Sequence, residues 1–156
     1  MARSRTSPSP QPLEAHVGFW MRFVSNHVSD RFRRLVEEAG VSVTEWVALR
    51  TLYDGEVTTH AALIDALGMT KGAASKVLTR LADKGLAQRH YAEDSAKAQV
   101  LALTPAGRAL VPRLAALADE NDAHFFGHLD ATEHKALMAL LQDLVQRHQL
   151  KDLPVD

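Results

Sequence analysis

Residues 70–86 read TKGAASKVLTRLADKGL, and their pattern decides how the surrounding chain folds. On a helical period of about 3.6 residues, one side of this segment is apolar and the opposite side is basic and hydroxylated. The apolar stripe is Ala74, Val77, Leu78 and Leu81, and the opposite face carries Lys71, Ser75, Lys76, Thr79 and Arg80. Thr70 is a favourable N-cap, and Gly85 stands where a left-handed residue would end the helix. The stretch therefore predicts an amphipathic helix with a basic outer face.

The segments on either side of this helix add to the pattern. Residues 59–67 form a predicted short apolar helix, and Gly68-Met69 joins it to the basic helix. Two helices joined by a tight, glycine-containing turn make a helix-turn-helix motif, whose second helix enters the DNA major groove. Downstream, residues 87–91 and 99–103 read as strands around a polar tip at residues 92–98. This hairpin is a predicted wing.

The order of these elements resembles the MarR family of bacterial winged-helix regulators. The resemblance covers roughly residues 13–150, and its most recognisable fragments are Gly85-Leu86 followed by Arg89, and Leu103-Thr104 followed by Gly107. It implies a homodimer whose two recognition helices bind a pseudo-palindromic operator, with half-sites roughly 10 bp apart. It also implies a repressor that is released when a small aromatic or carboxylate effector enters the crevice between the dimerisation helices and the winged domain.

Composition narrows the function classes. The chain has 156 residues, enough for one domain with its own core. It has no cysteine, which excludes disulfides, thiolate metal sites and cysteine nucleophiles. No apolar run is long enough for a membrane span and the first twelve residues do not form a signal peptide, so we expect a cytoplasmic protein. Phosphate-loop, dinucleotide-binding and nucleophile-elbow motifs are absent, which disfavours an enzyme.

Charge is distributed unevenly along the chain. The formal net charge is −1. Residues 70–99 nevertheless hold six Lys or Arg against three acids, a local +3, and residues 111–156 hold four against eight, a local −4. A basic middle and an acidic tail are the arrangement expected if the middle faces the phosphates of nucleic acid.

The fold class we predict is all-α with a small β-wing. Residues 1–12 are expected to be a disordered arm, residues 13–40 and 105–150 dimerisation helices, residues 42–104 the winged helix-turn-helix domain, and residues 151–156 a tail. The terminal helices carry more apolar surface than one winged domain can cover, which favours a homodimer. Ser42 and Asp130, each followed three residues later by glutamate, are predicted capping boxes. Pro112 predicts a kink in the helix that follows Pro105.

The DNA-contacting residues that we predict lie on the basic helix and the wing. Lys71, Ser75 and Lys76 are assigned to the groove, and Arg80 to groove or backbone, because early positions of a recognition helix reach base edges. Thr70 is assigned to a phosphate at the helix N-terminus, and Arg89 to another phosphate. In family wings an arginine near the tip enters the minor groove beside an acid. Lys97 takes the arginine position here, and Ser95 the acid position, so minor-groove readout is expected to be weaker.

The sequence also contains residues for a candidate effector site and a candidate metal site. An aromatic wall with polar handles suits a small effector, and the candidates are His16, Trp20, Trp46 and Arg50. His124 and His128 have an i, i+4 spacing that occurs in zinc sites, with Asp122, Asp130 and His134 nearby. The sequence implies no cofactor. A metal-responsive regulator and a winged-helix module used only for protein contact remain as alternatives.

Overall fold

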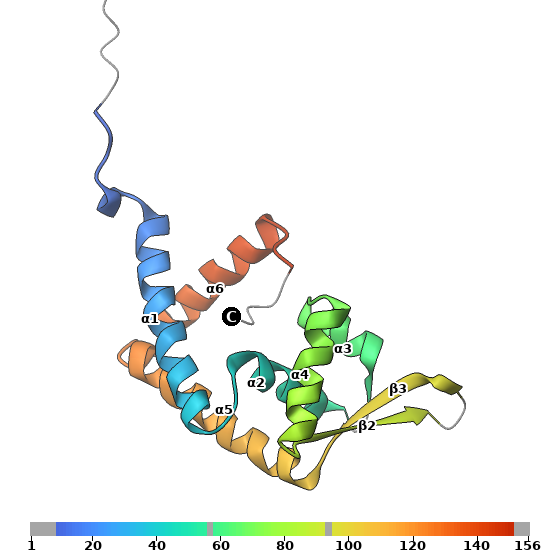
Figure 1. Cartoon of the computed structure of the whole chain (residues 1–156). Helices are drawn as coiled ribbons and strands as arrows, with labels where there is room; N and C mark the ends of the chain where they lie inside the picture. Colours follow the sequence, from blue (N-terminus) through green and yellow to red (C-terminus); the bar gives the residue numbers. More distant parts are fainter. Residues whose placement is uncertain (1–8, 56–57, 93–94, 152–156) are drawn as a thin grey trace, which may run out of the picture.

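The computed structural model describes residues 9–55, 58–92 and 95–151, and for residues 92 and 95–98 it describes the main chain only. Figure 1 shows a mostly helical molecule from which a β-hairpin projects. The elements in chain order are a 3-10 turn η1 (Leu13–Ala15), α1 (Val17–Glu38), α2 (Val43–Asp54), β1 (Thr58–Thr59), α3 (His60–Leu67), α4 (Lys71–Asp83), β2 (Ala87–Ala92), β3 (Ser95–Leu103), α5 (Pro105–Phe126) and α6 (Ala131–Arg147). The predicted helical fold with a small β-wing is confirmed.

Side-chain caps start the helices where the sequence predicted. Ser42 and Glu45 form a reciprocal capping box at α2, and Asp130 and Glu133 form another at α6. The Thr70 hydroxyl accepts a hydrogen bond from the Ala73 amide at 3.2 Å. Each of these contacts satisfies an amide that the first helical turn leaves without a partner.

Glycine closes the two helices of the helix-turn-helix. Gly68 ends α3 with φ of 62°, and Gly85 follows α4 with φ of 70°. Both are left-handed conformations that side chains disfavour, which accounts for glycine at both places.

The two family-like fragments meet at one point in space. The Thr104 hydroxyl donates to the Gly85 carbonyl at 2.6 Å, and the Thr104 amide donates to the Leu86 carbonyl at 3.1 Å. A Cβ on Gly107 would lie 2.0 Å from the Leu86 carbonyl oxygen. The start of α5 is therefore pinned against the end of α4, and only glycine permits this approach.

Two element boundaries differ from the sequence pattern. The first long helix begins at Val17 and not at residue 13, where the predicted dimerisation segment begins, because His16 is extended, with φ of −103° and ψ of 127°, and separates η1 from α1. None of the residues of η1 is buried, so no packing extends the helical pattern through it. The wing strands are also longer than predicted: β2 continues to Ala92 and β3 begins at Ser95, and these two residues pair beyond an irregularity in register between Tyr91 and Ala92.

A third strand was not predicted. β1 has two residues, and it pairs antiparallel with β3 in the sheet order β1-β3-β2. α5 runs through Pro112 as one continuous helix, so the kink remains a prediction.

The core lies between the helix-turn-helix, α2, the base of the wing and α5. Its buried side chains include Val77, Leu78 and Leu81 of the predicted apolar stripe of α4, and Ala74 of the same stripe is also buried. The core members are Val36, Val41, Ala48, Leu49, Leu52, Leu63, Leu67, Val77, Leu78, Leu81, Ala87, Leu101, Val111 and Leu114. The basic face of α4 must therefore point outward.

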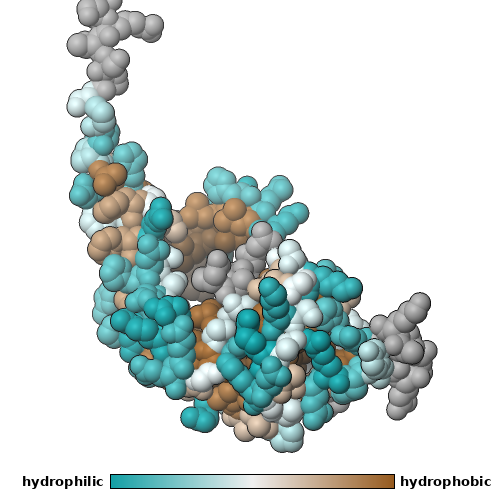
Figure 2. Space-filling model, viewed as in Figure 1, coloured by the Kyte–Doolittle hydropathy of each residue, from teal (hydrophilic) through white to brown (hydrophobic). Residues whose placement is uncertain are grey.

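Most of the exposed large apolar side chains lie at the opposite end of the molecule from the wing, on η1, α1 and α6. α6 contains no buried residue. Figure 2 shows hydrophobic surface on α6 and on the first part of α1. The exposed members are Leu13, Val17, Trp20, Met21, Phe23, Val24, Met138, Leu140, Leu141, Leu144 and Val145. Exposed apolar surface of this extent marks an interaction site.

Candidate nucleic-acid interface

The outward face of α4 is basic and accessible. Lys71, Lys76 and Arg80 are exposed, and Ser75 is partly exposed. An open surface depression runs along this face, and Gly72, Ser75, Lys76, Thr79 and Arg80 line it. Thr70 is exposed at the N-terminus of the helix, where the amides of Lys71 and Gly72 precede the first hydrogen bonds of the helix. The structure thus brings the predicted residues of α4 onto one surface.

Arg80 turns back toward the protein. Its Nε donates to Oε1 of Glu45 at 3.1 Å, while Lys84 Nζ donates to Oε2 of the same carboxylate at 2.7 Å. The Glu45 side chain is only 2% exposed, against 51% for Arg80 and 39% for Lys84. α4 is therefore tied to the first turn of α2 by two cations on one buried carboxylate.

The charge state of Glu45 follows from its neighbours. Burial alone would raise the pKa of this carboxyl, but hydrogen bonds from Lys84, from the Ser42 amide and from Arg80 outweigh burial and lower its pKa below the ordinary value. Glu45 is thus ionised at neutral pH, and both cations keep a charged partner.

Arg89 braces the middle of α4. Its Nη2 donates to the Ser75 carbonyl at 2.8 Å and to Oγ1 of Thr79 at 2.9 Å. The Thr79 hydroxyl donates in turn to the same Ser75 carbonyl at 2.9 Å. Arg89 is exposed, so its guanidinium is also accessible from solvent. Lys97 falls in β3, and its side chain lies outside the described part of the chain.

His60 is a residue that the sequence did not single out. It is the first residue of α3, and its Nε2 is buried without a hydrogen-bond partner among the described residues. Burial lowers its pKa, and the charges of Arg89 and Lys71 lower it further. A neutral imidazole thus lies directly behind the basic surface. One histidine after a threonine cap carries no signal of this placement in sequence alone.

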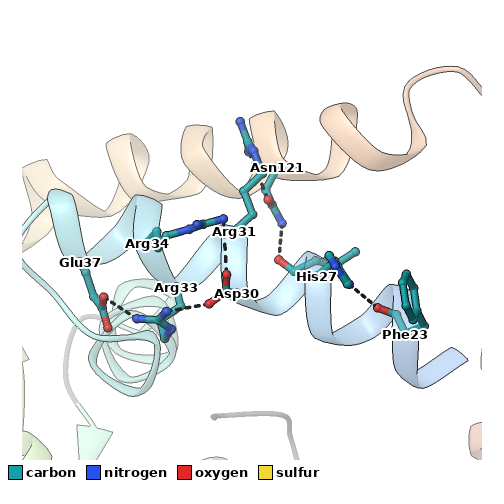
Figure 3. Close-up of polar contacts among 9 residues, drawn as sticks. Phe23, His27, Asp30, Arg31, Arg33, Arg34, Glu37 and Asn121 are labelled. Carbon is teal, nitrogen blue, oxygen red and sulfur yellow. Dashed lines mark hydrogen bonds and ion pairs between the residues drawn. The ribbon is translucent and has the colours of Figure 1, made fainter.

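A cavity of about 830 Å³ lies between α1, α2 and α5. Phe32 and Trp46 form its aromatic wall, with ring centroids 6.5 Å apart in an edge-to-face arrangement. Asn121, only 4% exposed, donates to the Val28 carbonyl at 3.1 Å and accepts from Arg31 at 3.2 Å. Asp30, Arg33 and Glu37 also line the cavity, and Figure 3 shows Arg33 between the two carboxylates.

The four predicted effector residues do not come together within the chain. Trp46 lines the cavity. Trp20 lies twelve residues before Phe32 on α1, about 18 Å along the helix axis, and its indole donates to the Glu14 carbonyl. His16 precedes α1, and Arg50 pairs with Asp54 and lies over the Tyr53 ring. The sequence analysis did not identify three polar residues that line the cavity, Ser25, Ser29 and Asn121. The i, i+4 spacing of Ser25 and Ser29 on an amphipathic helix was the signal available for two of them.

The histidine pair is not on one helical face. His124 lies in the last turn of α5, but Gly127 caps this helix and His128 is beyond its end. Within residues 9–55, 58–92 and 95–151, no three His, Asp or Glu side chains are placed to hold a metal ion. The described part of the chain also has no helix with the length and apolarity of a membrane span.

A helix-turn-helix with a basic recognition helix and an adjoining wing defines a winged-helix DNA-binding protein. Comparison with protein families matches residues 39–97 to the MarR family. The matched segment covers 59 of the 156 residues and includes α2, the helix-turn-helix and most of the wing, and relatives found by sequence are named transcriptional regulators.

Individual relatives are similar over more of the chain than the family match. The transcriptional repressor Rv2887 of Mycobacterium tuberculosis is 26% identical over 131 residues, covering 84% of this chain and 94% of that protein. Among solved structures, Bordetella bronchiseptica BpsR, described with regulation of its DNA binding by 6-hydroxynicotinic acid, superposes with a TM-score of 0.73 at 22% identity, over 87% of this chain and 97% of BpsR. A mutant of E. coli MarR complexed with operator DNA gives a TM-score of 0.72 at 19% identity, over 83% and 93% of the two chains. At these identities the two structures show the fold alone.

Proposed function

We propose that this chain is a sequence-specific repressor that binds a pseudo-palindromic operator as a homodimer and is released by a small effector. The observation that carries the proposal is α4 itself. Four of its side chains, Ala74, Val77, Leu78 and Leu81, are buried, and its basic face is left open over the depression described above. A helix held by its apolar side with a cationic groove-sized face outward is suited to the DNA major groove.

Roles within the interface follow from position. Lys71, Ser75 and Lys76 occupy the first half of α4 and are assigned to base edges. Thr70 and the α4 amides are assigned to a phosphate. Arg80 and Arg89 are each engaged within the protein by one edge of the guanidinium, so we assign their remaining nitrogens to phosphates. Lys97 keeps its proposed place in the minor groove.

Footprinting of the intergenic DNA beside the gene tests this proposal. We expect one protected segment that contains two related half-sites, centred roughly 10 bp apart. A Lys71→Ala, Lys76→Ala double variant should lose the footprint at concentrations where the parent protects fully. Protection spread evenly along the fragment would contradict sequence-specific recognition.

The exposed apolar faces of α1 and α6 support the dimer. α6 buries none of its residues within the chain, and Leu140 is 65% exposed. Covering such faces with a second copy removes the largest apolar surfaces from water. Light scattering should give twice the 17.1 kDa chain mass. A mass of one chain at micromolar concentration would contradict the dimer.

The cavity between α1, α2 and α5 is the proposed effector site. Its volume of about 830 Å³ falls in the range of small-molecule pockets. Phe32 and Trp46 supply an aromatic wall. Arg33 already pairs with Asp30 at 2.6 Å and with Glu37 at 2.8 Å, so these two carboxylates compete with a carboxylate effector for its guanidinium. A panel of aromatic acids and their amides, screened for release of labelled operator, tests the site and its charge preference.

A further inference from the structure

The first turn of α2 lies between the cavity and α4. Ser42, Val43, Thr44 and Trp46 line the cavity. Glu45 belongs to the same turn but does not line the cavity, and it contacts α4 instead. One helical turn therefore supplies a wall of the proposed effector site and the anchor of the proposed recognition helix.

The Glu45 carboxylate joins three parts of the chain. Oε2 accepts from the Ser42 amide at 3.0 Å and from Lys84 Nζ at 2.7 Å, and Oε1 accepts from Arg80 Nε at 3.1 Å. Lys84 Nζ also donates to the Gly40 carbonyl, just after α1, at 2.9 Å. The end of α1, the start of α2 and the last turn of α4 are thus connected through two charged groups.

Loss of either cation from the Glu45 carboxylate is energetically costly. A buried carboxylate deprived of a cation carries a large desolvation cost, so Glu45 has to follow its partners or be exposed. Movement of the α2 turn therefore moves Arg80 and Lys84. In the opposite direction, a DNA phosphate that binds the remaining nitrogens of Arg80 pulls on the guanidinium that Glu45 holds.

We propose that Glu45 is the positioning residue that couples the cavity to the recognition helix, so that occupancy of either surface changes the other through this carboxylate. The inference rests on the proposed function, because it concerns DNA at α4 and a ligand at the cavity. Linkage makes the coupling reciprocal. DNA alone must therefore perturb the cavity wall, and the test does not need the effector.

The two tryptophans provide the readout. The chain contains only Trp20 and Trp46, so protein labelled with 5-fluorotryptophan gives one ¹⁹F resonance from each, assigned with a Trp20→Phe variant. The probe is the intergenic duplex, and binding is followed in parallel by anisotropy. We expect the Trp46 resonance to shift when the duplex saturates the protein, and Glu45→Gln to lose this shift while binding DNA roughly fivefold more weakly.

Asp54→Asn is the matched control. Asp54 ends the same helix and pairs with Arg50, but neither residue is among the contacts to α4. This variant should keep the shift and the affinity. Lys84→Met removes the ion pair with Glu45 by changing the more exposed partner, and it replaces Glu45→Gln in the test if that variant does not fold. It should also lose the shift.

The outcomes separate the two proposals. DNA binding without a Trp46 shift in the parent protein, or a shift retained in folded Glu45→Gln or Lys84→Met, would overturn the coupling role alone. A shift retained in these variants would then reflect DNA acting on the indole directly. Absence of DNA binding by the parent protein would overturn the proposed function and the coupling with it.

Discussion

Arg89 of β2 donates a hydrogen bond to the main-chain carbonyl of Ser75 in α4 at 2.8 Å, so the wing holds the recognition helix directly. The same nitrogen also donates to the Thr79 hydroxyl. This contact fixes α4 relative to the wing before DNA arrives, which lowers the conformational cost of binding.

Replacing Arg89 should therefore weaken DNA binding by more than the loss of one phosphate contact. We expect Arg89→Ala to cost about 1–2 kcal/mol, or roughly five- to thirtyfold in Kd. Arg89→Lys keeps the charge but lacks the planar fork, so it should restore the salt dependence and not the affinity. Anisotropy titrations of both variants check this. Full rescue by lysine would show that Arg89 acts only as a charge.

Lys76→Ala should weaken operator binding without changing the dimer mass. A residue that reads a base edge contributes about 1–3 kcal/mol to discrimination, so the variant should lose preference for the operator over random DNA. Lys135→Ala, an exposed lysine on α6, is the matched control and should leave the affinity unchanged. A uniform loss on both duplexes, with a salt slope reduced by about 1, would reassign Lys76 to a phosphate.

The two glycines 72 and 107 should respond to alanine in opposite directions. A Cβ on Gly107 meets the Leu86 carbonyl oxygen at 2.0 Å, whereas a Cβ on Gly72 meets nothing within 4 Å. We expect Gly107→Ala to lower the free energy of unfolding by about 2–3 kcal/mol, and Gly72→Ala to raise it by about 0.5–1 kcal/mol. Urea unfolding of both variants checks the signs. A neutral Gly107→Ala would mean that α5 can move away from Leu86 at no cost.

Stability should fall on acidification in two steps. The pKa of His60 is lowered from 6.5, so the unfolded chain takes up a proton first and stability is lost as the pH falls from 6.5 toward the folded pKa. The pKa of Glu45 is lowered from 4.5, so its contribution is present above that value and is lost as the pH falls through the folded pKa.

Single substitutions show which residue causes each of the two losses of stability. His60→Phe should flatten the urea-midpoint profile below neutrality, and Glu45→Gln should flatten it in the acidic range, each leaving the other step in place. Midpoints measured across both ranges provide the check. A His60→Phe profile that overlays the parent would show that this imidazole keeps its ordinary pKa.

Local signals explain why much of the fold was predictable. Thr70, Gly85 and the Ser42–Glu45 box act within one turn, and each cap formed as predicted. The stripe of α4 needs only helical periodicity. In contrast, the interruption of the helical pattern at His16 accompanies a lack of buried residues in η1, and local sequence does not indicate which residues are buried.

The site was less predictable because its key contacts join distant residues. The pattern placed Arg80 on the outer face, which is correct, but its pairing with Glu45 spans 35 residues. Arg89 reaches Ser75 across 14 residues. Trp46 and Asn121 meet the same cavity from α2 and α5. A single sequence specifies residue types on a face and does not specify which long side chain crosses to another element.

Sequence-specific DNA binding through α4 is the central claim, and the most direct test is a fluorescence-anisotropy titration of the purified protein. The intergenic duplex beside its own gene and a random duplex of equal length are compared at two salt concentrations. We predict tighter binding to the intergenic duplex, with an affinity for both that falls steeply as salt rises. Binding that is absent, or equal for both duplexes and insensitive to salt, would contradict the account and point to a winged-helix module that contacts another protein.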